Sequence, residues 1–297
     1  MEIIFLGTSE ATPTAEKNQT SIYLKYGSEK ILIDVGENTQ RQMKIAKINP
    51  CSITRILITH WHGDHILGLP GLLQTLALNN YSQTLKIYGP RGSKKHLDIL
   101  LKAFIFEGKL KVEIYEVGNK IIVNEKDFFI ESREMSHGTP CIAYSFTEKD
   151  KRKIDLDKIK KLQIPNGPLI GQLQQGKSIR LKGKTIKPNL VSTNVKGRKI
   201  SVILDTEINE NCYKLAKDSN LLICEATFSK DLKDRAKERK HLTADQTAMI
   251  AKKSKSKKLM ILHISQRYNK KEEIILNEVK KIFPNSELAR DFMKIEL

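Results

Sequence analysis

The chain of 297 residues is poor in cysteine and in long apolar runs, and it has far fewer acidic than basic residues. Its four cysteines, Cys51, Cys141, Cys212 and Cys224, are widely separated and form no C-x-x-C pair. That spacing argues against a zinc ribbon, a redox motif and a disulfide framework. We expect all four to be reduced residues of the core.

No apolar run approaches the roughly 18 residues that a membrane-spanning helix needs. The opening residues 1–7 have no basic region and no small-residue cleavage site, so they predict a first strand rather than a signal peptide. We therefore expect a cytoplasmic protein with no membrane partner.

Positive charge is unevenly distributed along the chain. The 52 Lys and Arg residues exceed the 34 Asp and Glu residues, and the net charge of +18 favours a polyanionic partner such as nucleic acid. Residues 148–199 hold 15 basic and 4 acidic residues, so this segment carries +11 of that total. A solvated lysine-rich insertion would give the same count. We expect an appendage with its own partner.

Composition and length suit a soluble α/β protein, with 39% apolar and 29% charged residues. Short β-branched runs predict buried strands, and five of them end next to a residue that can do chemistry. These are runs 31–33, 55–59, 202–204, 221–224 and 259–262, followed by Asp34, His60, Asp205, Glu225 and His263. Ligands gather at the carboxyl ends of strands in such folds, so we expect one composite site.

Two helices are predicted in the last quarter of the chain. Thr243 and Gln246 have capping-box spacing, so a helix begins there and His241 lies just outside its first turn. A second helix is expected over 272–282, before Pro284.

The strongest motif is H-x-H-x-D-H, which places His60, His62, Asp64 and His65 directly after an expected strand. Three imidazoles and a carboxylate at this spacing can hold one metal ion or two adjacent ones. A polar loop with ordinary surface histidines is the alternative. His137 and His263 are further candidate ligands, and His241 is a separate catalytic candidate.

Several segments besides this motif resemble one known family. They are residues 6–14, 33–42, 64–71, 265–268 and 291–295, in order and at similar spacing. They resemble the ribonuclease Z branch of the metallo-β-lactamase superfamily, the endonucleases that mature the 3′ end of transfer RNA. The resemblance covers essentially the whole chain, in the short form of the enzyme.

That resemblance implies the α/β fold of the superfamily, a four-layer αββα sandwich with a protruding flexible arm. Residues 1–147 and 200–297 would form the hydrolase body, and the inserted residues 148–199 would be a basic arm that grips transfer RNA. Lysine and arginine in such an arm contact phosphates without reading bases. Residues 166–173, with their Gly-Pro pair, closely resemble the arm of the family.

The resemblance also implies two zinc ions per subunit. His60, His62 and His137 would hold the first ion, Asp64, His65 and His263 the second, and Asp205 would bridge both. Imidazoles with carboxylates suit zinc, although manganese or iron would also fit. Asp34 would orient ligand histidines through hydrogen bonds rather than bind metal.

The implied reaction is hydrolysis of a phosphodiester that leaves a 3′ hydroxyl on the transfer RNA and a 5′ phosphate on the trailer. The metals would make water acidic enough to supply hydroxide near neutral pH, with Asp64 accepting the proton. His241 would protonate the departing 3′ oxygen, and Glu225 would orient His241. A solvated carboxylate at a strand end is the alternative interpretation of Glu225.

Precursor transfer RNA is the expected partner. The resemblance also implies a homodimer, in which the arm of one subunit serves the RNA that the other subunit cuts. Two rival functions are also compatible with these residues. One is a hydrolase of the same superfamily that acts on a small phosphodiester or thioester. The other is a noncatalytic RNA-binding protein with a structural metal site.

Overall fold

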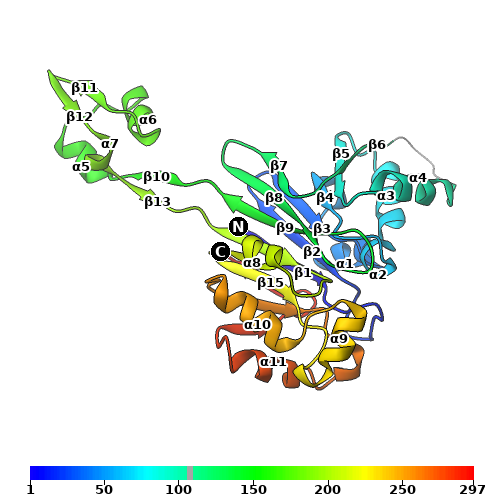
Figure 1. Ribbon diagram of the computed structural model, residues 1–297. Helices are drawn as coiled ribbons and strands as arrows, with labels where there is room; N and C mark the ends of the chain where they lie inside the picture. Colours follow the sequence, from blue (N-terminus) through cyan, green and yellow to red (C-terminus); the bar gives the residue numbers. More distant parts are fainter. Residues whose placement is uncertain (106–109) are drawn as a thin grey trace. The chain divides into compact units, whose positions relative to one another are not determined.

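The structure contains two large sheets, and the strands that are followed by the expected site residues lie in their interior (Figure 1). The structure is a computed structural model that describes residues 1–105 and 110–297. Within this part of the chain the first sheet has seven strands, in the order β18 (Lys294–Glu296), β1 (Glu2–Gly7), β2 (Ser21–Tyr26), β3 (Glu29–Ile33), β4 (Arg55–Leu57), β5 (Thr84–Gly89) and β6 (Lys111–Glu116). Neighbours from β3 to β6 are parallel.

The second sheet also has seven strands among the described residues. Their order is β17 (Ser286–Leu288), β16 (Leu259–Leu262), β15 (Leu221–Glu225), β14 (Lys199–Ile203), β9 (Cys141–Glu148), β8 (Phe128–Met135) and β7 (Lys120–Asn124). From β14 to β17, each strand is parallel to the next. Parallel strands bring their carboxyl ends to one edge, which is where the expected site residues lie.

Each sheet is covered on its outer face by helices. The first carries α1 (Thr39–Ile45), α3 (Leu69–Leu78) and α4 (Ser93–Lys102), with α2 (Gly63–Ile66) and the 3-10 helix η1 (Pro50–Ser52) in connections. The second carries α8 (Glu210–Ala216), α10 (Ala244–Lys253) and α11 (Glu273–Lys280), with α9 (Lys233–Arg239), η2 (Lys230–Leu232) and η3 (Gln266–Tyr268) in connections.

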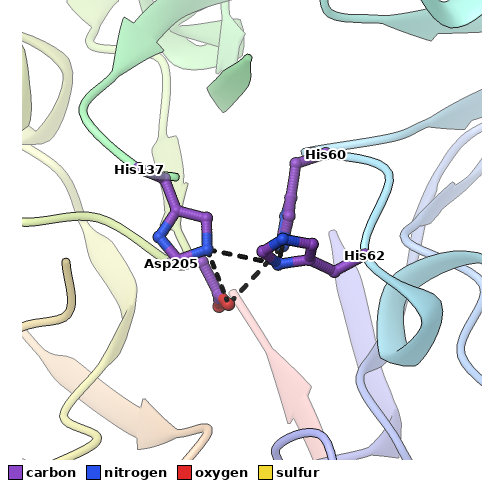
Figure 2. Close-up of side chains that lie close together, drawn as sticks. All are labelled: His60, His62, His137 and Asp205. Atoms are coloured by element: carbon purple, nitrogen blue, oxygen red, sulfur yellow. Dashed lines mark hydrogen bonds and ion pairs between the residues drawn. The ribbon is translucent and has the colours of Figure 1, made fainter. Parts of the chain in front are cut away.

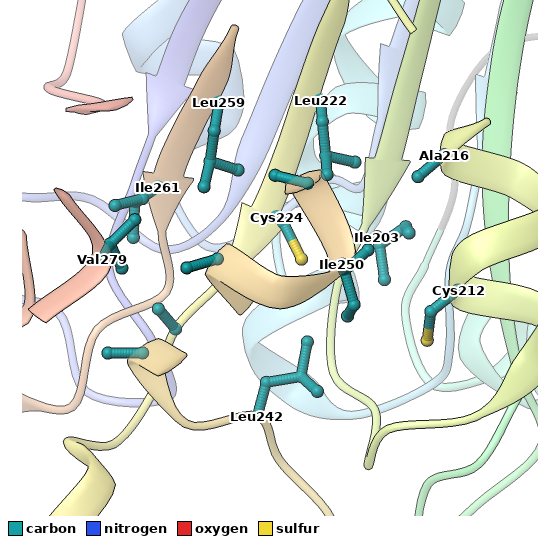
Figure 3. Close-up of a cluster of buried hydrophobic side chains, with 14 of the residues drawn as sticks. Ile203, Cys212, Ala216, Leu222, Cys224, Leu242, Ile250, Leu259, Ile261 and Val279 are labelled. Carbon is teal, nitrogen blue, oxygen red and sulfur yellow. The ribbon is translucent and has the colours of Figure 1, made fainter. Parts of the chain in front are cut away.

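Buried apolar side chains hold these layers together. Ile250 of α10 and Val279 of α11 pack with Leu222, Cys224 and Ile261 of the second sheet, as Figure 3 shows. The inner faces of the two sheets meet as well, because side chains of both line one narrow apolar space; these include Leu24, Ile31, Tyr144 and Val202. The expected four-layer αββα sandwich is confirmed.

The capping box, the last helix and the four cysteines can be compared with what the sequence predicts. Thr243 and Gln246 form the predicted capping box at the start of α10. The helix expected over 272–282 is α11, which is slightly shorter at both ends. Cys141, Cys212 and Cys224 are buried and Cys51 is half-buried, and all four are free thiols.

The described chain divides into two compact units, and residues 124–129 and 147–198 form the second. In it β10 (Lys151–Ile154) pairs with β13 (Ser192–Val195), and β11 (Ile179–Leu181) pairs with β12 (Lys184–Ile186). The helices α5 (Leu156–Lys161), α6 (Pro168–Gln174) and α7 (Pro188–Val191) complete it. The unit has its own small core, formed by Ile159, Ile164, Leu173, Ile179, Ile186 and Val191.

Gly167 is required at the start of α6. Its φ of 126° lies in a region that residues with a side chain rarely adopt, and Pro168 follows at the first helical position. The Gly-Pro pair thus sets the sharp entry into this helix. No described helix anywhere in the chain is both long enough and apolar enough to cross a membrane.

Candidate metal centre

The segment from the end of β4 through α2 carries four of the expected ligands. His60 and His62 lie in the loop between the two elements, and Asp64 and His65 lie in the single turn of α2 that follows. The His60 imidazole is fully buried, and its Nδ1 atom lies 3.1 Å from the Thr59 hydroxyl. This contact leaves Nε2 of His60 facing the other ligands.

The first group of candidate ligands combines this loop with two distant segments. His137 follows β8 and Asp205 follows β14, and together with His60 and His62 they offer ligand atoms that all lie within 4.8 Å of one another (Figure 2). His62 Nδ1 lies 3.0 Å from His60 Nε2 and 3.2 Å from His137 Nε2. Asp205 Oδ2 lies 3.6 Å from His60 Nε2.

The second group contains Asp64, His65, Asp205 and His263, and all four are buried. His263 Nε2 lies 3.3 Å from Asp64 Oδ2 and 3.2 Å from Asp205 Oδ1. His65 Nε2 lies 3.1 Å from Asp64 Oδ2. Asp205 belongs to both groups, so its carboxylate lies where two adjacent cations would share it.

Two observations indicate that these residues can hold a metal ion. The buried atoms His65 Nε2 and Asp205 Oδ1 form no hydrogen bond with any described residue. A buried polar atom without a partner is costly, and a cation between these atoms removes that cost. Imidazole nitrogens also face one another at about hydrogen-bond distance, and nitrogen and carboxylate donors of this kind are typical of zinc sites.

The protonation states of the first group favour metal binding, whereas in the second group the nearby carboxylates raise the pKa of His65 and of His263 against the effect of burial. Burial lowers the pKa of His60 and of His137, which keeps their lone pairs free. Burial alone would raise the pKa of Asp205, but the nearby His263 and His65 outweigh it, and the pKa falls well below its usual value. The pKa of Asp64 is lowered in the same way, with His65 as the main opposing partner of burial.

Backbone geometry at the strand ends is unusual. Asp34, Asp205 and His263 each follow a parallel strand directly or by two residues, and their φ values are 59°, 35° and 56°. Positive φ in residues other than glycine costs energy and tends to occur at functional sites. These turns aim Asp205 and His263 at the cluster, while Asp34 hydrogen-bonds to the ligand loop.

A second constellation lies beside the ligands. Glu225, the last residue of β15, is fully buried, and its Oε1 and Oε2 atoms lie 3.1 and 3.2 Å from Nδ1 of His241. Glu225 also accepts hydrogen bonds from Thr206 N at 2.7 Å and from the Thr227 hydroxyl at 2.5 Å. The carboxylate is therefore buried and fixed in place. This excludes the alternative interpretation of Glu225 as a solvated carboxylate at a strand end.

This pairing changes the protonation of His241. Burial lowers its pKa, but the Glu225 carboxylate outweighs burial and raises the pKa of His241 to about 9. The His241 ring lies 5.1 Å from the ring of His137 and 5.6 Å from that of His263, measured between centroids. An imidazole whose raised pKa favours the protonated form thus lies beside the candidate ligands.

All nine residues expected at the site are brought to this one region. Sequence reasoning missed Thr227, whose hydroxyl contacts Glu225 and lies 3.3 Å from His263 Nδ1 and 3.4 Å from His241 Nδ1. Its position two residues after Glu225 is the only signal that could have suggested it. The arginines Arg235, Arg239 and Arg267, which line a cavity with His241, were missed too, because no local spacing links Arg267 to the other two.

Comparisons with known proteins agree with this geometry. The sequence model of the anti-Pycsar protein Apyc1 family matches residues 1–133. Ribonuclease Z of Methanothermobacter thermautotrophicus is 38% identical, covering 100% of this chain and 97% of the relative. Ribonuclease Z of Pyrococcus horikoshii is 40% identical, covering 100% and 96%.

Solved structures show the same fold. The short form of human tRNase Z is 25% identical with a TM-score of 0.71, covering 100% of this chain and 99% of that one. The metallo-β-lactamase fold protein YhfI from Bacillus subtilis has a TM-score of 0.72 at 15% identity, covering 100% and 98%. Curated relatives match this chain over nearly their whole length, so the chain belongs to the ribonuclease Z family and has the metallo-β-lactamase fold.

Proposed function

We propose that this chain removes the 3′ trailer from precursors of transfer RNA, leaving a 3′ hydroxyl on the transfer RNA and a 5′ phosphate on the trailer. As a member of the ribonuclease Z family, the chain is an endoribonuclease. The observation that carries the proposal is the Glu225–His241 pair beside two groups of candidate ligands that share Asp205. A structural metal site would have no use for a positioned proton donor.

The proposed cofactor is two zinc ions per subunit, with manganese or iron as substitutes. His60, His62 and His137 would hold one ion, Asp64, His65 and His263 the other, and Asp205 would bind both. When bound, the ions would make water more acidic and stabilise the negative charge that grows on the phosphate. The buried atoms His65 Nε2 and Asp205 Oδ1, which form no hydrogen bond with the described residues, support this assignment.

Two side chains would move protons. Asp64 would stay ionised, since its pKa is lowered despite burial, so its carboxylate can accept a proton from the attacking water. His241 would give its proton to the departing 3′ oxygen, because Nδ1 is held by Glu225 and Nε2 is left for the substrate. Protonation matters here, since an alkoxide is a poor leaving group.

The second unit would be the RNA-binding arm, corresponding to residues 148–199. Lysines at 158, 160, 161, 182, 184 and 187 are exposed on it, and such residues bind phosphates in a salt-dependent way. A reader of backbone charge suits a folded RNA that is recognised by its shape. The unit would thus supply affinity while the metal centre supplies chemistry.

We propose further that two subunits form a homodimer in the cytoplasm, with the arm of each serving the RNA that the other cuts. Resemblance to the family supports this arrangement, as do the large apolar side chains Ile45, Leu67 and Leu78, which are exposed. Light scattering at the concentration used for cleavage tests it. A monomeric mass with cleavage intact would contradict the proposed dimer.

The decisive experiment is incubation of the zinc-loaded protein with a precursor transfer RNA that carries a 3′ trailer, followed by analysis of both new ends. We expect one cut at the base of the trailer, with a 3′ hydroxyl and a 5′ phosphate. Chelation should abolish the cut, and added zinc should restore it. Hydrolysis of small phosphodiesters or thioesters without any cut in the precursor would favour the rival hydrolase.

A further inference from the structure

A cavity of about 530 Å³ adjoins the candidate active site on the side of His241. Its lining includes Arg235, Arg239 and Arg267 as well as Phe228 and His241. Arg235 and Arg239 come from α9, the helix that ends just before His241, and Arg267 comes from η3. Two segments that are about thirty residues apart in the sequence thus place three guanidinium groups around one space.

The two arginines of α9 are available to a ligand. They are four residues apart, which puts them on the same face of the helix, and both side chains are exposed. Arg235 has no ion-pair partner among the described residues, and Arg239 has only its exposed neighbour Glu238, at 3.7 Å. Such a contact is weak in water and is readily exchanged for a phosphate.

Arg267 is held in place by its neighbours. Its guanidinium carbon lies 5.4 Å from the centroid of the Phe228 ring, and its Nε atom donates a hydrogen bond to the Ser265 hydroxyl at 3.3 Å. Contact with an aromatic face and a hydrogen bond restrict the side chain before any ligand arrives. Arg267 can therefore present its guanidinium at low entropic cost.

Glu10 also lines this cavity, and its charge has to be considered. One of its carboxylate oxygens accepts from Gln266 N at 3.1 Å and the other accepts from Ala11 N at 2.9 Å. These amide donors occupy the carboxylate and tie the loop after β1 to η3. The three arginines outnumber the single carboxylate of Glu10, so the cavity has a net positive charge, which suits an anion.

His241 connects this cavity to the reacting centre, because it lines the cavity while its ring lies near His137 and His263. If His241 protonates the departing 3′ oxygen, the nucleotide that bears this oxygen lies against His241. The strand that leads to that nucleotide then continues on the cavity side. This strand is the retained RNA, not the trailer.

We propose that Arg235, Arg239 and Arg267 form a phosphate subsite for the retained strand, and that they bind the phosphate on the 5′ side of its last nucleotide. The inference rests on the proposed function and adds a direction to it, since it states which side of the cut lies in this cavity. Guanidinium groups bind phosphates through paired hydrogen bonds, so the subsite would hold the strand in register with the metals.

The test combines protein variants with neutral phosphate substitutions. The double variant Arg235→Ala, Arg239→Ala should lower kcat/KM for a precursor by about tenfold or more. A methylphosphonate at the phosphate 5′ of the last retained nucleotide should cost the wild-type enzyme a similar factor. It should cost the double variant clearly less than it costs the wild type, because two of the three arginines that bind this charge are already gone.

Lys237→Ala is the matched control, since Lys237 is an exposed cation of the same helix that does not line the cavity. It should change kcat/KM by less than about twofold. Hydrolysis of bis-p-nitrophenyl phosphate, which has no flanking nucleotides, should be the same in all these proteins. A normal rate on this diester also shows that the double variant is folded.

Other outcomes overturn the inference in distinguishable ways. Coupling of the arginines to the first phosphate inside the trailer would reverse the proposed direction. Equal costs of the methylphosphonate in wild type and double variant, at either position, would remove the subsite altogether. If wild type cuts no precursor while hydrolysing the small diester, the proposed function fails, and the subsite fails with it.

Discussion

The Nδ1 atom of His65 lies 2.6 Å from the Oδ2 atom of Asp34, which is fully buried at the end of β3. The same carboxylate accepts hydrogen bonds from the backbone N and the hydroxyl of Thr59, both at 2.7 Å. The Asp34 side chain thus joins Thr59, just before His60, to the candidate ligand His65. The imidazole of His65 is oriented with Nε2 toward the metal centre.

Asp34→Ala should therefore weaken metal binding without removing any ligand. We expect zinc affinity to fall by about 10- to 100-fold, because outer partners of ligand histidines have effects of this size. Competition with a chromogenic chelator measures the change. Asp98→Ala, at an exposed position of α4, is the control and should bind zinc normally. Unchanged affinity in Asp34→Ala would contradict the orienting role.

Among the described residues, Asp205 is the one candidate ligand common to both groups, so its loss should affect both proposed metals. Asp205→Ala should abolish precursor cleavage and lower the bound zinc, measured by elemental analysis after dialysis. Asp205→Asn keeps the shape but loses the charge, and it should lie between wild type and alanine in metal content. Full activity of Asp205→Ala at unchanged metal content would be incompatible with two metals sharing this residue.

The pH dependence should report on His241. Burial opposes the charged form, yet Glu225 raises the pKa of His241 to about 9, so the proposed proton donor would be present below that pH and lost above it. Precursor cleavage should decline on the alkaline side accordingly. Glu225→Gln removes the charge that raises the pKa, so the decline should begin at lower pH. The measurement is kcat against pH for both proteins.

Bis-p-nitrophenyl phosphate provides the control for that experiment. Its leaving group departs without a proton, so its hydrolysis should not need His241 as an acid. The profile for this diester should therefore be similar in wild type and in Glu225→Gln. If cleavage of the precursor declined at the same alkaline pH in wild type and in Glu225→Gln, the proposed donor pair would be excluded.

Removal of the basic insertion should separate binding from chemistry. Replacing the residues between Lys149 and Lys199 by a short Gly/Ser linker removes no proposed ligand. Precursor binding and cleavage should collapse, and the salt dependence of RNA binding should flatten because fewer counterions are released. Hydrolysis of the small diester should stay within about tenfold, a barrier change of about 1.4 kcal/mol. A folded truncated protein that processes precursors normally would refute the proposed arm.

Gly197 allows a subtler test of the second unit. A Cβ atom there would lie 1.8 Å from the carbonyl oxygen of Glu148, where two guanidinium nitrogens of Arg198 bind the Glu148 carboxylate at 2.6 and 2.7 Å. Gly197→Ala should force these segments apart and raise KM for the precursor while sparing the small diester. Gly171→Ala, where a Cβ meets nothing within 4 Å, should leave KM unchanged.

Much of the fold could be predicted because its signals are local. Strand runs followed by polar residues and the capping box at Thr243 depend on neighbours in the sequence, and each is present in the structure. The second unit includes residues 124–129, which the charge of the insertion did not suggest. That turn belongs to the unit through contacts such as Lys149 N to Asp127 O at 2.8 Å, which no local pattern encodes.

For the site, the sequence by itself determined the ligand loop, since His60, His62, Asp64 and His65 lie within six residues and local spacing brings them together. Only the tertiary structure decided that Asp205 belongs to both ligand groups, that Thr227 contacts Glu225, and that arginines from two segments surround one cavity. The reason is physical. Local spacing fixes direction only within a turn, whereas contacts between distant strand ends depend on sheet order and on the left-handed turns that follow the strands.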